Sequence, residues 1–184
     1  MKCLAKFVDP LIILLVMVAE PRAQVPKPTP EQTKWDFWVG DWTLVGTARD
    51  APTDLEYKSV WTLHGRPILG GFFVQVDQVW KGNGPEEHSL EILSYDPSKR
   101  THASTGFTNF GSTWVATATY DDGTVVETGT TTTSGRKVIK FRGTYVFSPD
   151  RMAVSMTSES EMDGVRWTNF TVKGTKAKAP VRTK

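Results

Sequence analysis

The sequence predicts an all-β protein: an antiparallel up-and-down β-barrel of about ten strands with a short N-terminal helix, preceded by a signal peptide. Three observations predict this fold. Turn signals interrupt the chain after Gly40 about every 8–12 residues, the spacing typical of sandwiches and barrels. Apolar and polar residues alternate within the runs between turns, as expected of strands with one buried face. No helical pattern of about 10–15 residues separates the runs, which disfavours a parallel α/β sheet.

Residues 1–23 are typical of a signal peptide. Two lysines precede a continuous apolar run over 11–19, which is too short for a stable transmembrane anchor. Cleavage after Ala19 or Ala23 would leave a secreted or periplasmic chain with no stable membrane span, whereas an uncleaved N-terminal anchor is the alternative. Cys3 is the single cysteine, so the mature chain would have no disulfide and no thiolate ligand.

A proline-rich linker and the start of a short helix are expected over residues 24–36. Thr29 is placed to cap a helix over about 30–38, and Gln32 stands where a capping box requires it. The side chains expected on one face of this helix are Trp35, Trp38 and Val39. The barrel domain is expected over 37–173, because the β-rich pattern fills this segment.

The expected strands and the turns between them support the barrel. They are expected at 42–48, 56–63, 70–80, 87–95, 100–108, 113–120, 124–133, 137–147, 152–161 and 166–172. The breaks between them contain glycine, proline, asparagine and aspartate, which favour turns. Alternation gives most strands a single apolar face, as in a sheet that closes around its own core.

The charge distribution argues against nucleic acid as a partner. The chain carries a formal +2, with +1 in residues 1–23 and +5 in residues 173–184, so the body between them carries −4. An acidic body is unlike a nucleic-acid groove. We interpret residues 174–184 as a basic flexible tail, although such a tail is also able to contact phosphates or anionic lipids. The sequence leaves the oligomeric state open.

Four segments resemble, in order, a family of uncharacterised bacterial calycin-like barrels, related to lipocalins and fatty-acid-binding proteins and known as a domain of unknown function. They are FWVGDW (37–42), HGRPILGGFF (64–73), ILSYDPSKR (92–100) and MDGVRW (162–167). The resemblance implies a ten-stranded barrel without an assigned activity. It also implies that Gly40 turns the chain into the first strand, that Trp42 plugs one end of the barrel, and that Arg166 packs on Trp42.

A binding site for a small hydrophobic molecule is expected in the interior. The candidate lining residues are Trp61, Phe72, Trp114, Phe141, Tyr145 and Met156. The same side chains would serve equally well as a packed core. Fatty-acid-binding barrels hold a carboxylate with an arginine and a tyrosine, but alternation places Arg142 and Tyr145 on opposite faces.

No catalytic residue, metal site or cofactor is predicted. The three histidines lack metal-ligand spacing, and we interpret His102, the one candidate haem ligand, as an ordinary surface or rim histidine. The acid pairs at 86–87, 121–122 and 159/161 fall in turns or on the outer face, so none is a convincing general acid–base pair. An enzyme of the same fold, or a structural or partner-binding module with a filled core, remains an alternative to the ligand-binding barrel.

Overall fold

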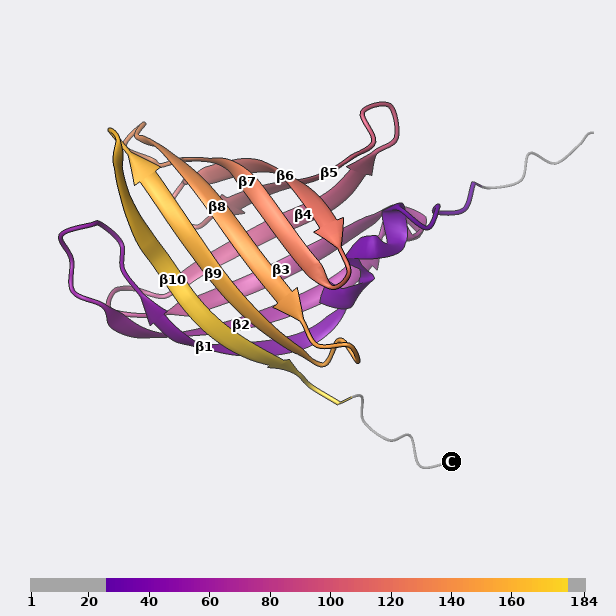
Figure 1. Cartoon of the computed structure of the whole chain (residues 1–184), viewed down its shortest axis with the longest axis horizontal. Helices are drawn as coiled ribbons and strands as arrows, with labels where there is room; N and C mark the ends of the chain where they lie inside the picture. Colours follow the sequence, from indigo (N-terminus) through magenta and orange to yellow (C-terminus); the bar gives the residue numbers. More distant parts are fainter. Residues whose placement is uncertain (1–25, 179–184) are drawn as a thin grey trace, which may run out of the picture.

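The computed structural model describes residues 26–178 and shows a closed barrel of ten antiparallel strands (Figure 1). Each strand pairs with its neighbour in the chain, and β1 pairs with β10 to close the barrel. The predicted fold class is therefore confirmed. The elements are η1 (Gln32–Trp38), β1 (Gly40–Ala48), β2 (Tyr57–Ile68), η2 (Leu69–Gly71), β3 (Phe73–Lys81), β4 (Glu87–Asp96), β5 (Thr101–Thr108), β6 (Thr113–Asp121), β7 (Thr124–Thr132), β8 (Val138–Phe147), β9 (Ala153–Met162) and β10 (Val165–Lys176).

Three strand ends differ from the expected ones by three residues or more: β2 ends at Ile68 and not at 63, β3 begins at Phe73 and not at 70, and β10 ends at Lys176 and not at 172. Gly70 and Gly71 have φ angles of 73° and 88°, a left-handed conformation that ends β2 and delays β3 until Phe73. Phe72 therefore lies between the strands and not within one. At the other end of the chain β10 continues to Lys176, because residues up to this lysine pair with β1. The strand thus includes the first residues of the expected tail.

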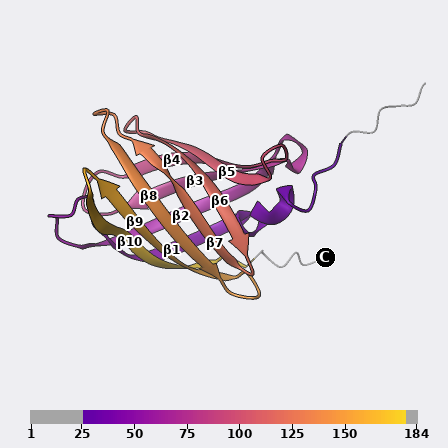
Figure 2. The same ribbon diagram turned by 45° about the horizontal axis from the view of Figure 1, so that its top comes forward.

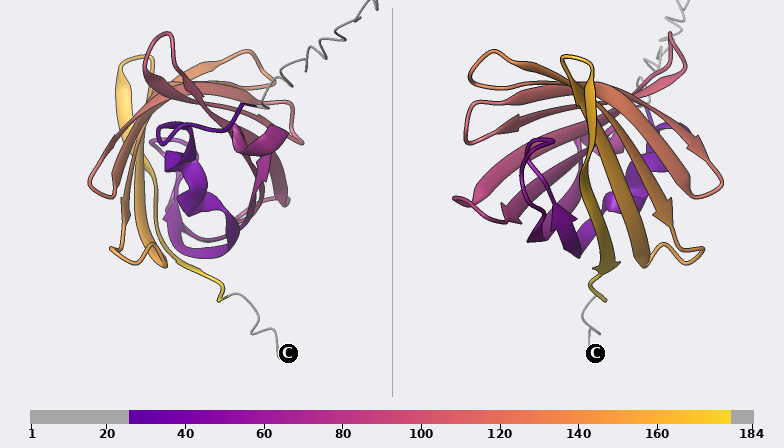
Figure 3. Two further views of the ribbon diagram at one scale, coloured as in Figure 1. Left: turned by 90° about the vertical axis from the view of Figure 1, so that its right-hand side faces the viewer. Right: turned by 60° about the vertical axis from the view of Figure 1, so that its left-hand side comes forward.

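The short helix η1 is a 3-10 helix that closes one end of the barrel. Thr29 and Gln32 form the predicted reciprocal contacts: the Thr29 N–H donates to Gln32 Oε1 over 2.8 Å, and the Gln32 N–H donates to Thr29 Oγ1 over 3.4 Å. The aromatic side chains of η1 are buried, and Figure 3 (left) looks into this end and shows η1 lying across it. Gly65 permits this approach, because a Cβ there would lie 2.0 Å from the Trp38 carbonyl oxygen.

An aromatic plug fills the end beneath η1. Phe147 lies at its centre, with ring centroids 4.1 Å from Phe37, 5.2 Å from Trp38 and 6.1 Å from Trp42. Such aromatic pairs add stability beyond the area they bury. The plug separates the barrel interior from solvent at this end.

Lys176, and not Arg166, covers Trp42. The Lys176 ammonium lies 5.5 Å from the centre of the Trp42 ring and donates to the Phe37 carbonyl oxygen over 3.3 Å. Arg166 lies at the far end of β10, where its side chain is 80% exposed and pairs with Glu161 at 2.7 Å. The expected Arg166–Trp42 contact is therefore wrong, because Trp42 on β1 pairs with Lys176 at the end of β10, whereas Arg166 lies near its start, at the opposite end of the barrel.

The remaining strand ends meet at the opposite end of the barrel. The loops there span 49–56, 82–86, 109–112, 133–137 and 163–164. Figure 2 shows strands of the near wall crossing those of the far wall steeply, as strand tilt in a closed barrel requires. No helix within residues 26–178 is long and apolar enough to cross a membrane. The expected signal peptide, residues 1–23, and the end of the basic tail, residues 179–184, lie outside the described residues.

Candidate functional site

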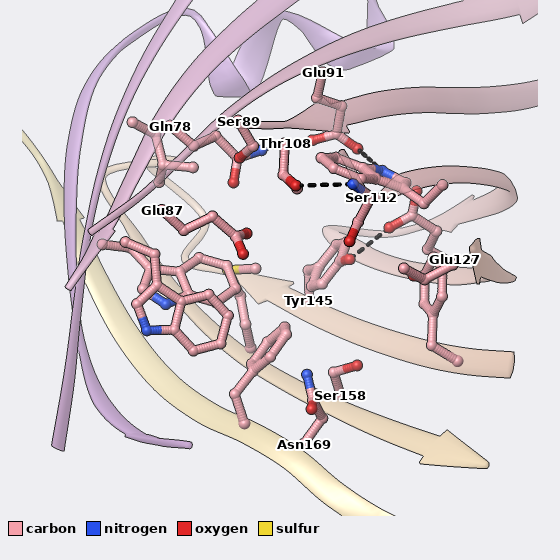
Figure 4. Close-up of a pocket in the computed structure, with 18 of the residues that line it drawn as sticks. Gln78, Glu87, Ser89, Glu91, Thr108, Ser112, Glu127, Tyr145, Ser158 and Asn169 are labelled. Atoms are coloured by element: carbon pink, nitrogen blue, oxygen red, sulfur yellow. Dashed lines mark hydrogen bonds between the residues drawn. The ribbon is translucent and has the colours of Figure 1, made fainter. Parts of the chain in front are cut away.

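The barrel interior contains a cavity of about 250 Å³ (Figure 4). It begins beneath the aromatic plug, where Trp35 and Trp38 line it, and extends toward the opposite end, where Glu87, Thr108 and Thr131 line it. The volume exceeds the roughly 150 Å³ of an engineered cavity that binds benzene, and it falls just below the ~300 Å³ typical of the smallest drug-sized pockets. The interior is thus of a size for a small organic molecule.

One wall of the cavity is aromatic. The ring centroid of Trp61 lies 4.6 Å from that of Trp80 and 4.6 Å from that of Phe170. These three residues come from β2, β3 and β10, which lie together in the closed sheet around β1. They present a continuous apolar surface to the interior.

The other wall carries two inward-facing carboxyl groups, Glu91 on β4 and Glu127 on β7. Glu91 accepts hydrogen bonds from Gln78 Nε2 over 2.9 Å and from Trp114 Nε1 over 3.3 Å. Glu127, which is 4% exposed, accepts from the Tyr145 hydroxyl over 2.5 Å and from the Ser104 hydroxyl. Figure 4 shows both carboxylates turned into the cavity beside Tyr145.

Two glycines create the space that the aromatic donors need. A Cβ on Gly106 would lie 2.0 Å from the Trp114 ring, so the indole lies directly over this glycine. Gly106 is paired in register with Glu91 on one side and with Trp114 on the other, which lets the indole reach across β5 to the carboxylate. Gly143 plays the same part for Tyr145, because its Cβ would lie 2.6 Å from the Tyr145 hydroxyl.

Burial and mutual repulsion keep protons on this carboxyl pair. Burial, followed by the negative charge of Glu127, raises the pKa of Glu91 to about 8. Burial also raises the pKa of Glu127, against the opposing effect of its hydrogen bonds from Ser104 and Tyr145. Burial beside these carboxylates raises the pKa of Tyr145 as well, so its phenol stays protonated and able to donate. At neutral pH the pair retains at least one proton.

A bulge in β10 adds an amide to the cavity. Thr168 pairs with Glu159 and Phe170 pairs with Ser158, so Asn169 has no partner on β9. A bulge of this kind redirects a side chain, and Asn169 lines the cavity.

Trp61 adds a hydrogen-bond donor to the site. Its indole N–H is buried, and no described residue accepts a hydrogen bond from it.

Five of the six expected lining residues lie around this cavity. They are Trp61, Trp114, Phe141, Tyr145 and Met156. Phe72 is not among the lining residues, because it follows η2 outside the strands. Trp61 and Met156 also belong to the packed core, so the two roles weighed for these side chains coexist.

His102 lies at the rim of the barrel, near the start of β5, but it is only 7% exposed, so it is a buried rim histidine and not a surface one. Its Nε2 lies 2.9 Å from the Glu31 carbonyl oxygen, which fixes the ring beneath η1 outside the large cavity. Within residues 26–178 no group of three or more histidine, cysteine or acidic side chains is arranged to hold a metal ion.

The carboxyl pair was not among the predicted site residues. Alternation contains the signal: Glu91 shares a face with the buried Leu93, and Glu127 shares a face with the buried Val125. Because acids in strands usually face solvent, single glutamates within these runs were not considered as candidate interior residues. A strict application of period two would have placed both carboxylates inside.

Fold and site together define a small closed β-barrel with an interior cavity whose polar wall is acidic. The chain belongs to the family described as "Protein of unknown function (DUF1579)", whose model matches residues 27–175. No curated protein matches the sequence. Among solved structures, the crystal structure of Rv2717c from M. tuberculosis is similar, with a TM-score of 0.64 and 11% sequence identity over 83% of this chain and 100% of that one. At this identity the likeness concerns the fold alone.

Proposed function

We propose that the protein binds a small molecule with an apolar body in the interior of its barrel. The observation that carries the proposal is the cavity of about 250 Å³, which is closed by the aromatic plug at one end and lined by aromatic side chains along one wall. Binding pockets typically combine such an apolar lining with a few convergent polar groups, here Glu91, Glu127 and Tyr145. A cavity of this size also argues against the filled core of a purely structural module.

Native mass spectrometry of the chain purified from its own host tests the proposal. The expected result is a non-covalent mass that disappears on denaturation, which gives the mass of the ligand directly. A bare protein mass, together with no change in the fluorescence of added naphthol, would overturn the proposal.

Catalysis is the second candidate function, and the carboxyl pair favours it. Because the pKa of Glu91 is raised to about 8, this residue holds a proton at neutral pH that a general acid can donate. The released ligand distinguishes the two functions: binding alone returns it unchanged, whereas catalysis returns a product that a Glu91→Gln variant does not form.

We also propose that the chain is exported, on the grounds of the apolar run and its flanking lysines in residues 1–23. N-terminal sequencing of the protein recovered from the export compartment is expected to begin at Glu20 or Gln24. A chain that retains Met1 would contradict cleavage.

A further inference from the structure

The cavity carries negative charge that no cationic side chain in it balances. Three of its lining residues are glutamates, namely Glu87, Glu91 and Glu127. None of the described lining residues is a lysine, arginine or histidine. Buried carboxylates in proteins are normally paired with a cation or protonated. The missing complement is therefore a proton or a positively charged ligand.

Both central carboxylates retain capacity for further hydrogen bonds. An ionised carboxyl group offers about four lone-pair positions. The structure commits two positions on Glu91, to Gln78 and Trp114, and two on Glu127, to Tyr145 and Ser104. Each therefore has positions left for the N–H groups of a ligand.

The opposite wall suits the body of such a ligand. The faces of Trp61, Trp80 and Phe170 form an apolar surface that also attracts cations through the negative potential of aromatic rings. Trp61 adds an independent polar requirement. The Trp61 residue is 7% exposed, and its buried indole N–H has no acceptor among the described residues. Buried donors in native proteins are almost always paired. An oxygen on the ligand would supply this acceptor.

We propose that the cavity binds a small organic amine in its protonated form, with the ammonium group at Glu91 and Glu127 and an oxygen-bearing apolar body against the aromatic wall. This inference rests on the proposed interior binding function and names its ligand class. Carboxylate ligands are excluded by the same geometry. Arg142, the arginine nearest in sequence to Tyr145, alternates to the outside of β8, and Tyr145 is committed to Glu127.

Calorimetric titration of the protein from its own host, freed of bound ligand by exhaustive dialysis, with three matched probes tests the inference. Tyramine carries an ammonium group, tyrosol replaces it with a neutral hydroxyl, and hydroxyphenylacetate replaces it with an anion, whereas all three share the phenol ring. Tyramine is expected to bind about 10- to 100-fold more tightly than tyrosol, the range that one charge-assisted hydrogen bond gives. Hydroxyphenylacetate is expected not to bind.

Two variants locate the preference. Glu127→Gln is expected to weaken tyramine binding at least about tenfold and to change tyrosol binding less than about twofold. Glu159→Gln removes the same charge from the exposed outer face of β9 and is expected to change neither affinity. If the Glu127→Gln variant does not fold, the Glu91→Gln variant is used in its place. The ratio of tyramine to tyrosol affinity in the unmodified protein tests the amine preference without any variant.

The outcomes separate the two proposals. Tyrosol binding equal to or tighter than tyramine binding would overturn the amine inference and leave interior binding standing. Failure of all three probes to bind would overturn the amine inference, and interior binding would fall with it only where native mass spectrometry also gives a bare protein mass. A tyramine preference that Glu159→Gln abolishes and Glu127→Gln preserves would place the amine outside the cavity and overturn the inference.

Discussion

Stability should fall as pH rises, because the fold buries an acid that resists ionisation. Glu91 has a pKa of 4.5 in an unfolded chain and about 8 in the folded protein. Below pH 4.5 both states are protonated and the contribution to stability is complete. Between these two values the native state binds one more proton than the unfolded state, so the free energy of unfolding falls with rising pH. Above pH 8 the contribution is lost.

The magnitude follows from the shift. Each pKa unit corresponds to about 1.4 kcal/mol, so the full loss is about 5 kcal/mol, and about 4 kcal/mol of it occurs between pH 5 and 8. A Glu91→Gln variant keeps the shape and cannot ionise. Its amide oxygen can accept from Trp114, and a flipped Gln78 amide can accept from its NH₂ group. The variant is therefore expected to lose much less stability over this range.

Urea unfolding of the ligand-free protein, followed by tryptophan fluorescence at pH 5, 6, 7 and 8, measures the effect. The difference in the free energy of unfolding between Glu91→Gln and the unmodified protein should grow by about 4 kcal/mol in favour of the variant over this range. Glu159→Gln, on the outer face, is the matched control and should follow the unmodified protein. Parallel profiles for Glu91→Gln and the unmodified protein would refute the reasoning, because they would mean that ionisation of the pair is not coupled to folding.

Three further predictions test how the site and the plug are built. Gly106→Ala places a Cβ against the Trp114 ring and should cost about 1–3 kcal/mol of stability, measured by urea unfolding. An unchanged unfolding midpoint would show that the indole moves freely. Lys176→Met should lower stability by about 1–2 kcal/mol through loss of its contacts with the plug, whereas Arg166→Ala should change it by less than about 0.5 kcal/mol. A larger loss of thermal stability for Arg166→Ala than for Lys176→Met would contradict the assignment of Lys176 to the plug. Tyr145→Phe removes a donor that favours ionised Glu127, so tyramine should bind about tenfold more weakly at pH 7, with tyrosol little changed. Equal losses for both probes in calorimetry would contradict this role.

The barrel was predictable because alternation depends on a strict geometric period. Residues such as Ile139, Phe141 and Phe147 share a face of β8 whatever their partners are, and the structure places them toward the interior. Strand ends were less predictable. The sequence shows Gly70 and Gly71 but not their positive φ angles, which end β2 and remove Phe72 from β3.

The site was less predictable because its contacts join residues far apart in the chain. Arg166 was expected at the plug because the family resemblance implied that it packs on Trp42. Lys176 reaches Trp42 only because the two residues are partners in the β1–β10 register. Likewise Glu91 and Glu127 come together across the interior from β4 and β7. Which residues face each other across a closed barrel depends on the register of all the strands that connect them. No local sequence pattern therefore defines such contacts.

The cost of the carboxyl pair bears on why the fold retains it. Because burial raises the pKa of Glu91 to about 8, the ligand-free protein keeps a proton on the pair at neutral pH, and the associated loss, up to about 5 kcal/mol, is comparable with the whole stability of many domains, ~5–15 kcal/mol. Two hydrophobic residues of similar volume would avoid this cost. A bound ammonium group would take the place of the proton and allow both carboxylates to ionise. Binding should then release about one proton per tyramine near pH 7, and this release is measurable as a dependence of the binding enthalpy on the ionisation enthalpy of the buffer. Binding without proton release would mean that the pair keeps its proton and accepts from the ammonium group through its remaining lone pairs.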